Sequence, residues 1–490
     1  MHKFYYLIGI ITCLLFVACD DYDHWTTSLS AHFVFSQDTI RFDTIITGQG
    51  STTRSLVVFN HGDEGLRNVS VRLKNGSQSL FRVNVDGQYL FEGQGDDFQV
   101  QRRDSMVVRV EVSLPAYGDE QIRHYEDQLL FTLESGLTQG ICLEADGMDV
   151  RILRGKVIET DDTLTAGMPY QIFDSLVVAP GATLTLEPGT RLLFHDQTSL
   201  LVHGSLKALG TQEQPVTLQS DGVEKMFTNM TYDDTPNRWG GVHLFADSHD
   251  NVLEQCDIHS GSYGIQCDSL PSLALENPFL TLHHSVLHNI AGNALTLHST
   301  VARITGTQIS NALARCVEIR GGDVFMAQCT VAQFYPFSAD RQEALYLINV
   351  DEAEQPVPLL KAHFLNCVIT GYADNEVFGR LSDDEKEPAN YLFDHCLLRT
   401  APSEDTLRFK SIVYDNQDLE PVNYYQHFAT FDTKNLIYDF APVDSSAIAV
   451  AGSPEYAELY CPIDRRGRAL RREDGKVPCG AYAVAPKKEE

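Results

Sequence analysis

A short sequence frame that recurs in the second half of the chain constrains the fold more than any other feature. The frame reads apolar-x-x-(Cys/Ser/Thr)-x-apolar and occurs six times. Two of its five intervals are 22 residues, and the others are 29, 38 and 29 residues. A period of this length predicts stacked coils, each of which buries its apolar face only against its neighbours. The central residues of the six frames are Cys256, Ser285, Thr307, Cys329, Cys367 and Cys396.

These central residues are small and predict an internal column. Strands of neighbouring coils stack about 4.8 Å apart, which would place the six side chains one above another. Cysteine metal sites usually contain close pairs such as CxxC, and this sequence has no such pair. We therefore interpret the four cysteines of the column as packing residues.

The residues added to the 22-residue period indicate where a ligand would bind. They fall near 267–278, 334–358 and 380–390, and a further excursion covers 221–238. Insertions at equivalent points of successive coils project from one side of a solenoid, often its binding side. Aromatic candidates for sugar binding in or beside these excursions are Tyr232, Trp239, Tyr263 and Tyr335. For Trp239, the two glycines that follow it favour a place in the coil interior instead.

Two segments resemble a known family of folds. The segment 176–222 contains a Pro-Gly-Thr turn at 188–190, and a Trp-Gly-Gly-Val run follows at 239–242. Both resemble coils of right-handed parallel β-helices. The end of the chain also resembles that of bacterial β-helix proteins, with Ser-Ala-Ile at 446–448, Asp-Arg-Arg-Gly-Arg at 464–468 and Gly-Ala-Tyr at 480–482. The resemblance implies a cap over the open end of the solenoid. Cys461 and Cys479 lie in this tail and are candidates for a disulfide.

The N-terminal third of the chain predicts a different domain. About seven short alternating strands separated by turns indicate a β-sandwich. Their order resembles that of immunoglobulin-like modules of the abnormal-spindle/Hydin and choice-of-anchor type, over about 120 residues. None of its residues indicates catalysis, so we expect a spacer or docking domain. The expected strands are 32–35, 55–60, 69–73, 81–85, 106–112, 129–133 and 141–145.

The first residues indicate targeting. Lys3 precedes an apolar run at 4–17, which is short for a membrane span and typical of a signal peptide. The run ends in Phe-Val-Ala-Cys at 16–19, which resembles a bacterial lipobox and implies lipidation of Cys19. Several acyl chains anchor a protein stably. The acidic residues at 20, 21 and 23 resemble the surface-export signal of Bacteroidetes lipoproteins, which implies the outer membrane and its outer leaflet. An ordinary secretory signal is the alternative.

The expected domains follow from these patterns. They are a signal peptide at 1–18, an acidic tether at 19–30, the immunoglobulin-like sandwich at 31–155, the right-handed parallel β-helix at 165–400 and a C-terminal cap or tail at 401–490.

The charge of the chain excludes some partners. Lys and Arg number 37 against 67 Asp and Glu, which gives a net charge of −30. Nucleic acid must be met by clustered Lys and Arg, so it is not an expected partner. A basic patch on anionic lipid is excluded for the same reason. Membrane contact is therefore expected through the lipid anchor.

Catalysis is an alternative that the β-helix resemblance raises, because polysaccharide lyases and glycoside hydrolases use this fold. A glycosidase needs two carboxylates. Adjacent acids occur as Asp233 with Asp234 and as Asp383 with Asp384, but 67 acidic residues make such pairs common. A Gly-His-Gly of the polygalacturonase type is absent. Asp257 and Asp268 suit a Ca²⁺-dependent lyase as ligands, although no Lys or Arg base accompanies them.

Several histidines form an apparent cluster in the same region. Successive strand residues point to opposite faces, so adjacent histidines cannot converge. Stacked or turn histidines are therefore favoured over a metal site, and we expect no metal or cofactor unless Ca²⁺ serves a lyase. The histidines are His243, His249, His259, His283, His284, His288 and His298.

Together these patterns predict an all-β surface lipoprotein that binds or adheres without catalysis, to a glycan or a surface protein. A polysaccharide lyase or glycoside hydrolase and a structural envelope protein are the two alternatives. The overall resemblance is to Bacteroidetes surface lipoproteins of the choice-of-anchor/β-helix repeat family.

Overall fold

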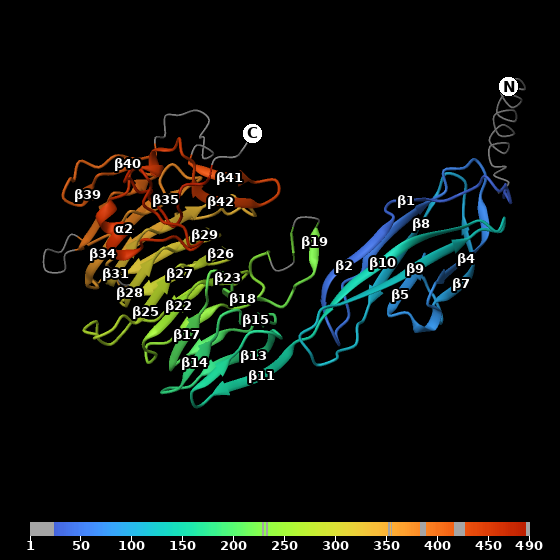
Figure 1. Ribbon diagram of the computed structural model, residues 1–490, viewed down its shortest axis with the longest axis horizontal. Helices are drawn as coiled ribbons and strands as arrows, with labels where there is room; N and C mark the ends of the chain where they lie inside the picture. The colour runs from blue at the N-terminus through green and yellow to red at the C-terminus, as the bar shows by residue number, and fades with distance from the viewer. Residues whose placement is uncertain are drawn as a thin grey trace, which may run out of the picture. The chain divides into compact units, whose positions relative to one another are not determined.

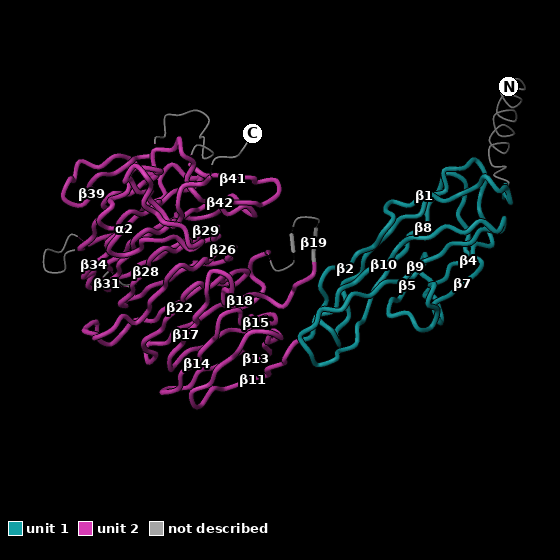
Figure 2. The backbone as a smooth tube through the Cα atoms, viewed as in Figure 1, with its two compact units in different colours: residues 1–149 teal, residues 150–490 magenta. Residues whose placement is uncertain are grey.

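The computed structural model describes residues 24–227, 230–231, 234–350, 353, 355–382, 389–415 and 427–486. The chain divides into two compact units, residues 1–149 and 150–490 (Figures 1 and 2). Regular structure in the described ranges is almost entirely β-strand, with a single α-helix, α2 (Pro454–Tyr460). None of the helices found in these ranges is long and apolar enough to cross a bilayer.

The first unit consists of two five-stranded sheets around one core. Alternation builds this core: in β8 the residues at 106, 108, 110 and 112 are buried and those between them are not. In spatial order the first sheet contains β1 (Val34–Phe35), β3 (Arg54–Phe59), β8 (Ser105–Val112), β5 (Phe81–Val85) and β6 (Gln88–Tyr89). The second sheet contains β2 (Thr39–Ile46), β10 (Thr138–Met148), β9 (Arg123–Thr132), β4 (Leu66–Leu73) and β7 (Gln94–Val100).

Each of the seven segments that the sequence predicted as strands in this unit contains a strand, and the structure adds β2, β6 and β7. The pairing of β2 with β10 is parallel, whereas the other pairings in the two sheets are antiparallel.

The second unit is built from three columns of parallel strands, the architecture of a β-helical solenoid. The first column contains β12 (Asp162–Leu164), β14 (Thr183–Leu186), β17 (Ser205–Leu209), β22 (Asn251–Glu254), β25 (Leu280–His283), β28 (Val301–Thr305), β31 (Gly322–Ala327), β34 (Leu359–Leu365), β37 (Tyr391–Asp394) and β39 (Phe409–Lys410). The second contains β15 (Arg191–Phe194), β18 (Val216–Ser220), β23 (Cys256–His259), β26 (Val286–Ile290), β29 (Gln308–Ala312), β32 (Thr330–Gln333), β35 (Val368–Gly371), β38 (Leu397–Leu398) and β40 (Val413–Tyr414). The third contains β16 (Leu200–Val202), β21 (Val242–Leu244), β24 (Ile265–Cys267), β27 (Leu295–His298), β30 (Val317–Arg320), β33 (Leu345–Ile348) and β36 (Val377–Arg380).

The solenoid begins earlier than the sequence predicted. β11 (Arg151–Ile158) already pairs in parallel with β13 (Tyr170–Val178), which in turn pairs with β15 and β16. The boundary between the compact units lies at 149/150, whereas the prediction ended the sandwich at 155 and began the β-helix at 165.

The repeated frame forms the expected internal column. Its six central residues are all fully buried. They are also hydrogen-bonded from coil to coil: the backbone N–H of Cys256 donates to Ser285 Oγ (3.0 Å), and that of Ser285 to Thr307 Oγ1 (3.3 Å). The backbone N–H of Cys367 likewise donates to Cys396 Sγ (3.4 Å). Burial raises the pKa of the Cys256 thiol far above its ordinary value, so it stays protonated. The cysteines are packing residues, as predicted.

A second column, which we call the corner residues, turns the chain from the first column of strands into the second. Each member directly precedes a residue of the internal column and has φ between 48° and 58°. This left-handed conformation costs most residues energy and is best tolerated by Gly, Asn and a few polar residues. The corner residues are Gln255, His284, Gly306, Gln328, Asn366 and His395.

The C-terminal tail packs along this corner, which corrects the predicted cap over the open end. We call residues 453–482 the strap. Its hydrogen bonds reach the corner residues of five coils. Gln255 Nε2, for example, donates to the carbonyl oxygen of Arg465 (3.1 Å), and Asn366 Nδ2 to that of Ser453 (2.9 Å). Residues 401–415, assigned to the cap by prediction, instead add β39 and β40 to the solenoid. Between these parts β41 (Phe428–Asp432) and β42 (Ile437–Pro442) form an antiparallel pair.

The predicted disulfide between Cys461 and Cys479 is not formed. Both thiols are free and buried, and each lies beside a different corner residue. Cys461 Sγ is 3.4 Å from His284 Nε2, whereas Cys479 Sγ donates to the carbonyl oxygen of His395 at 3.0 Å. The two cysteines therefore anchor different parts of the strap.

Candidate functional site

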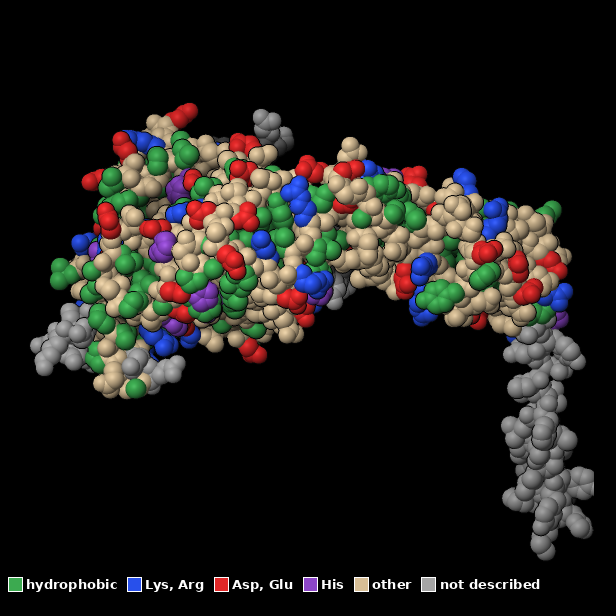
Figure 3. Space-filling model, turned by 90° about the horizontal axis from the view of Figure 1, so that it is seen from below, with side chains coloured by type: hydrophobic (Ala, Val, Ile, Leu, Met, Phe, Trp, Pro, Cys, Tyr) green, Lys and Arg blue, Asp and Glu red, His purple; other side chains and the backbone are tan. Residues whose placement is uncertain are grey.

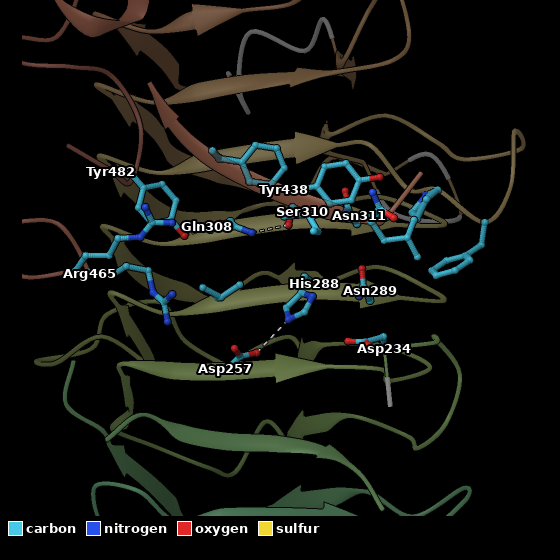
Figure 4. A pocket seen from close by; sticks show the side chains of 18 residues that line it. Asp234, Asp257, His288, Asn289, Gln308, Ser310, Asn311, Tyr438, Arg465 and Tyr482 are labelled. Atoms are coloured by element: carbon cyan, nitrogen blue, oxygen red, sulfur yellow. Dashed lines mark hydrogen bonds and ion pairs between the residues drawn. The ribbon is translucent and has the colours of Figure 1, made fainter. Parts of the chain in front are cut away.

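A pocket of about 320 Å³ lies on the outer face of the second column, over β23, β26 and β29 (Figure 4). Strand alternation supplies its floor. In register, Asp257 lies beside Val286, and Val286 beside Gln308. The next outward-facing row contains His259, His288 and Ser310. The floor thus carries a polar row from three consecutive coils.

The walls come from four separate segments of the chain. Two excursions between the second and third columns contribute, together with the β41–β42 hairpin and the strap. The insertions do not all leave the coils at one corner. The excursion 221–238 connects the second column to the third, whereas 268–279 connects the third column to the first. The wall residues are Asp234, Pro336 and Phe337 from the excursions, Asn435, Leu436, Ile437, Tyr438 and Phe440 from the hairpin, and Arg465, Arg466 and Tyr482 from the strap.

Asp257 is the electrostatic centre of the floor. Its Oδ1 lies 2.9 Å from His259 Nδ1 and 3.2 Å from His288 Nε2 (Figure 4 shows the second contact). The two imidazole rings stack with their centroids 4.8 Å apart. Burial favours the neutral acid, but the charge of His288 and the hydrogen bonds from both histidines outweigh it, so the pKa of Asp257 lies well below its usual range. Asp257 is therefore a carboxylate at neutral pH.

The strap places cationic and phenolic groups at the opposite side of the pocket from Asp234 (Figure 4). Arg466 pairs with Asp439 at 2.8 Å and lies 4.6 Å above the ring of Tyr482. The hydroxyl of Tyr482 donates to Gln308 Oε1 (2.5 Å). Arg465 donates from Nε to the carbonyl oxygen of His284 (3.3 Å) and forms no ion pair with any residue of the described ranges. A positive charge is thus left available to a ligand.

Two buried polar atoms of the pocket have no partner among the residues that the structure describes. One is Oδ1 of Asn311, a residue only 4% exposed and held at φ 55°. The other is the hydroxyl of Tyr438, on the hairpin wall. A buried polar atom without a hydrogen bond costs roughly 1–3 kcal/mol. Both atoms are covered in this geometry, so a ligand hydroxyl can reach them only after a side chain of the pocket wall moves.

Two of the predicted ligand-binding aromatics are buried, which contradicts that role. Trp239 is 1% exposed and stacks on Phe194 with 4.3 Å between ring centroids. Its Nε1 donates to the carbonyl oxygen of His259 (2.7 Å), so the alternative place in the coil interior is the observed one. Tyr335 is also buried and packs against Phe337. The excursion that contains Tyr335 reaches the pocket through Pro336 and Phe337 instead.

The remaining predicted residues are distributed as follows. Tyr263 is half-buried, with its hydroxyl 3.4 Å from Ser199 Oγ, and does not line the pocket. Asp234 lies in the pocket wall. Asp268 pairs with His243 at 2.9 Å and is not part of the Asp257 cluster. The predictions for Cys19, Tyr232, Asp233, Asp383 and Asp384 fall outside the described residues.

The histidines do not form one group. His284 faces the strap and His283 bonds to Thr305, while His243 and His298 pair with acids of the third column. His283 and His284 do lie together, with ring centroids 3.7 Å apart, against the prediction, because the left-handed backbone at His284 breaks the alternation of the strand. His259 and His288 converge across two neighbouring strands, and a signal for this was present. They are 29 residues apart, the same interval as between Cys256 and Ser285 of the internal column.

Comparisons with known proteins give no family. No family model matches the chain, and no curated protein matches it. Among solved structures, the catalytic domain of a GH87 alpha-1,3-glucanase matches with a TM-score of 0.19 at 8% identity, covering 74% of this chain and 87% of that one. A protein of unknown function from Porphyromonas gingivalis has a TM-score of 0.17 at 14% identity, covering 27% and 58%. A family 123 glycoside hydrolase from Clostridium perfringens has a TM-score of 0.19 at 8% identity, and this chain spans 26% of its length. Similarity this low carries no information about activity.

Proposed function

We propose that this chain is a lipid-anchored surface protein whose solenoid binds a saccharide in the pocket over β23, β26 and β29. In this proposal Cys19 carries the lipid in the outer membrane, and the two-sheet unit is an immunoglobulin-like spacer. The solenoid is a right-handed parallel β-helix of the kind found in Bacteroidetes lipoproteins. The lipobox at 16–19 and the acidic residues after it support the anchor.

The observation that carries the binding proposal is the pair of unpartnered buried atoms, Asn311 Oδ1 and the Tyr438 hydroxyl. Saccharides supply many hydroxyl groups that can satisfy such atoms. The floor adds Ser310, and Phe337, which is 39% exposed, offers an apolar ring edge. A volume of about 320 Å³ is at the small end of ligand sites, suited to a monosaccharide or disaccharide.

Charge also favours this class of ligand. On the face shown in Figure 3, acidic side chains are interspersed with basic and neutral ones and form no single patch. Within the pocket, Arg465 offers a cation, whereas Asp257 and Asp234 are acids. A largely neutral, hydroxyl-rich ligand meets this mixture better than a polyanion does.

Hydrolysis is a second candidate because Asp234 and Asp257 line the same pocket. A glycosidase needs one protonated acid and one carboxylate. Asp257 is held ionised by its two histidines, so it can serve only as the base or nucleophile. Asp234 would then have to be the acid. Binding without hydrolysis needs no such assignment and is the proposal that we favour.

The test uses the chain from residue 20 onward on a glycan array, followed by a reducing-sugar assay on any glycan bound. Tyr438→Phe removes only the unpartnered hydroxyl, so it should be at least as stable as the wild type and bind the glycan roughly ten times more weakly. Tyr460→Phe, at an exposed tyrosine outside the pocket, is the matched control and should bind like the wild type.

Each outcome decides between the candidates. Binding that weakens in Tyr438→Phe alone, without release of reducing ends, supports the proposal. Release of reducing ends by the wild type that is lost in Asp234→Asn would support hydrolysis in place of binding alone. The absence of any bound glycan, or equal binding by both variants, overturns the pocket as a saccharide site.

A further inference from the structure

We propose that Asp257, His259 and His288 form a transition-metal site, best suited to Zn²⁺, at the floor of the pocket. Each residue offers one ligand atom, and these three atoms lie within 4.8 Å of one another. The proposal of the metal site stands on this geometry alone. Its role toward a ligand rests on the proposed saccharide function.

The distances suit a tetrahedral ion. Zn²⁺ binds imidazole nitrogen and carboxylate oxygen at about 2.0–2.2 Å, which sets neighbouring ligand atoms about 3.3 Å apart. Asp257 Oδ1 is already 2.9 Å from His259 Nδ1 and 3.2 Å from His288 Nε2. A metal ion would replace the two hydrogen bonds with three coordination bonds, and it would draw the two imidazole nitrogens, which lie within 4.8 Å of each other, to about the same spacing.

The donor set selects the kind of ion. Two imidazole nitrogens and one carboxylate suit zinc and other first-row transition ions. Ca²⁺ takes six to eight oxygen ligands, and this cluster contributes two nitrogens. The Ca²⁺ that the sequence suggested for a lyase is therefore not the ion that these residues favour.

The scaffold holds the three side chains in place. His259 and His288 lie in register on adjacent strands, β23 and β26, and Asp257 is two residues before His259 on the same strand. The indole N–H of the buried Trp239 fixes the carbonyl oxygen of His259. Ligands on regular strands are positioned more precisely than ligands on loops, which lowers the cost of organising them.

Exposure shows where a fourth ligand would bind. The side chain of His259 is 11% exposed, whereas those of His288 and Asp257 are 24% and 31% exposed, and both of these line the pocket. A site with three protein ligands leaves one position open. Here that position faces the pocket, so a hydroxyl or carboxylate oxygen of a bound saccharide would complete the coordination of the ion.

The test is calorimetric titration of Zn²⁺ into metal-free chain from residue 20 onward, with no saccharide present. We expect one ion per chain, and affinity weakened roughly 100-fold or more in His288→Ala. The matched control is His243→Ala, which removes a histidine paired with Asp268 at 2.9 Å on the neighbouring column and should leave the affinity unchanged. Co²⁺ should give the visible absorption of a tetrahedral site in the wild type and in the control only.

The result that would overturn the proposal is an absence of zinc binding, or equal binding by His288→Ala; the three residues would then form only a hydrogen-bonded network. His288→Gln, which keeps a polar side chain at this position, shows whether loss of binding reflects misfolding, since its thermal unfolding should match that of the wild type. Repeating the glycan array with and without Zn²⁺ separates the two proposals. Zinc binding with no glycan bound keeps the metal site and removes the saccharide function. Glycan binding that is indifferent to zinc removes the ion's role toward the ligand.

Discussion

His284 and Cys461 are in contact although 177 residues separate them in the chain. His284 Nε2 lies 3.4 Å from Cys461 Sγ and 3.0 Å from the carbonyl oxygen of Ile463. The contact ties the strap to a corner residue of the solenoid, and the strap also supplies Arg465 and Tyr482 to the pocket. The position of the pocket wall therefore depends on how firmly the strap is docked.

The pH should control this docking. Burial, with a smaller contribution from the charge of His283, lowers the pKa of His284 to about 4. The ordinary pKa in the unfolded chain is about 6.5, so the folded state binds the proton less readily. The docked strap is thus fully stable above pH 6.5 and loses up to roughly 3 kcal/mol as the pH falls to 4.

Hydrogen exchange of residues 453–482 between pH 7 and pH 4, corrected for the intrinsic rate, measures this loss. His284→Asn tolerates the left-handed backbone at φ 48° and does not titrate, so its strap should show much less pH dependence. An identical pH profile in the wild type and the variant would assign the effect to other groups near the contact, such as Asp464.

Gly306 should be essential for the same contact. Its φ is +58°, and a Cβ there would meet the imidazole ring of His284 and lie 2.9 Å from Cys461 Sγ. Gly306→Ala should therefore release the strap and destabilise the chain by roughly 2 kcal/mol, from backbone strain and the steric clash. Urea unfolding and exchange of the strap would measure both effects. Gly136→Ala, at a positive φ in the first unit with open space around it, isolates the strain alone.

Regular features of the fold could be predicted from the sequence because they are local or periodic. Alternation indicated the strands of the first unit, and the 22-residue intervals from Ser285 to Thr307 and from Thr307 to Cys329 indicated the coil repeat, with 29 residues from Cys256 to Ser285. His259 and His288 are separated by the same 29 residues and so occupy the same position in successive coils. The repeat, combined with strand alternation, therefore predicts that they lie side by side.

Contacts made across long separations could not be predicted in this way. No periodicity links Cys461 to His284 or Tyr482 to Gln308, because the strap is not a coil and docks through single side chains. The expected cap and the expected disulfide both failed for this reason. The parts of the pocket wall that come from the strap and the β41–β42 hairpin were missed with them.

Ser285 tests the internal column. Its Oγ accepts from the backbone N–H of Cys256 (3.0 Å) and donates to the carbonyl oxygen of His283 (2.9 Å). Ser285→Ala removes that acceptor inside a fully buried column and should cost roughly 1–3 kcal/mol in urea unfolding. Ser285→Cys should cost less than about 1 kcal/mol, since Cys396 Sγ accepts the same kind of N–H bond from Cys367. Equal losses in the two variants would mean that packing, and not the hydrogen bond, sets the preference.

Glu318 should control stability in acid. It is buried on β30, where its carboxylate lies 3.2 Å from His298 Nε2 and 2.9 Å from a guanidinium nitrogen of Arg315. The hydrogen bond from His298, together with the charge of Arg315, lowers the pKa of Glu318 to about 2 against the opposing effect of burial. A carboxyl group whose pKa is lower in the folded chain than in the unfolded chain stabilises the fold at a pH above its unfolded pKa of about 4.5. That contribution is lost between about pH 4.5 and pH 2.

Glu318→Gln should therefore lower the free energy of unfolding at pH 7 by up to roughly 3 kcal/mol, and the difference from the wild type should shrink as the pH falls below 4.5. Urea unfolding at pH 7, 4 and 3 measures it. Glu187→Gln, at an exposed acid on the same unit that forms no ion pair within the described ranges, is the control and should differ from the wild type by less than about 0.5 kcal/mol at each pH. If the loss in Glu318→Gln were the same at pH 3 as at pH 7, the ionised carboxylate would not be its cause, and the amide would be acting through packing on β30.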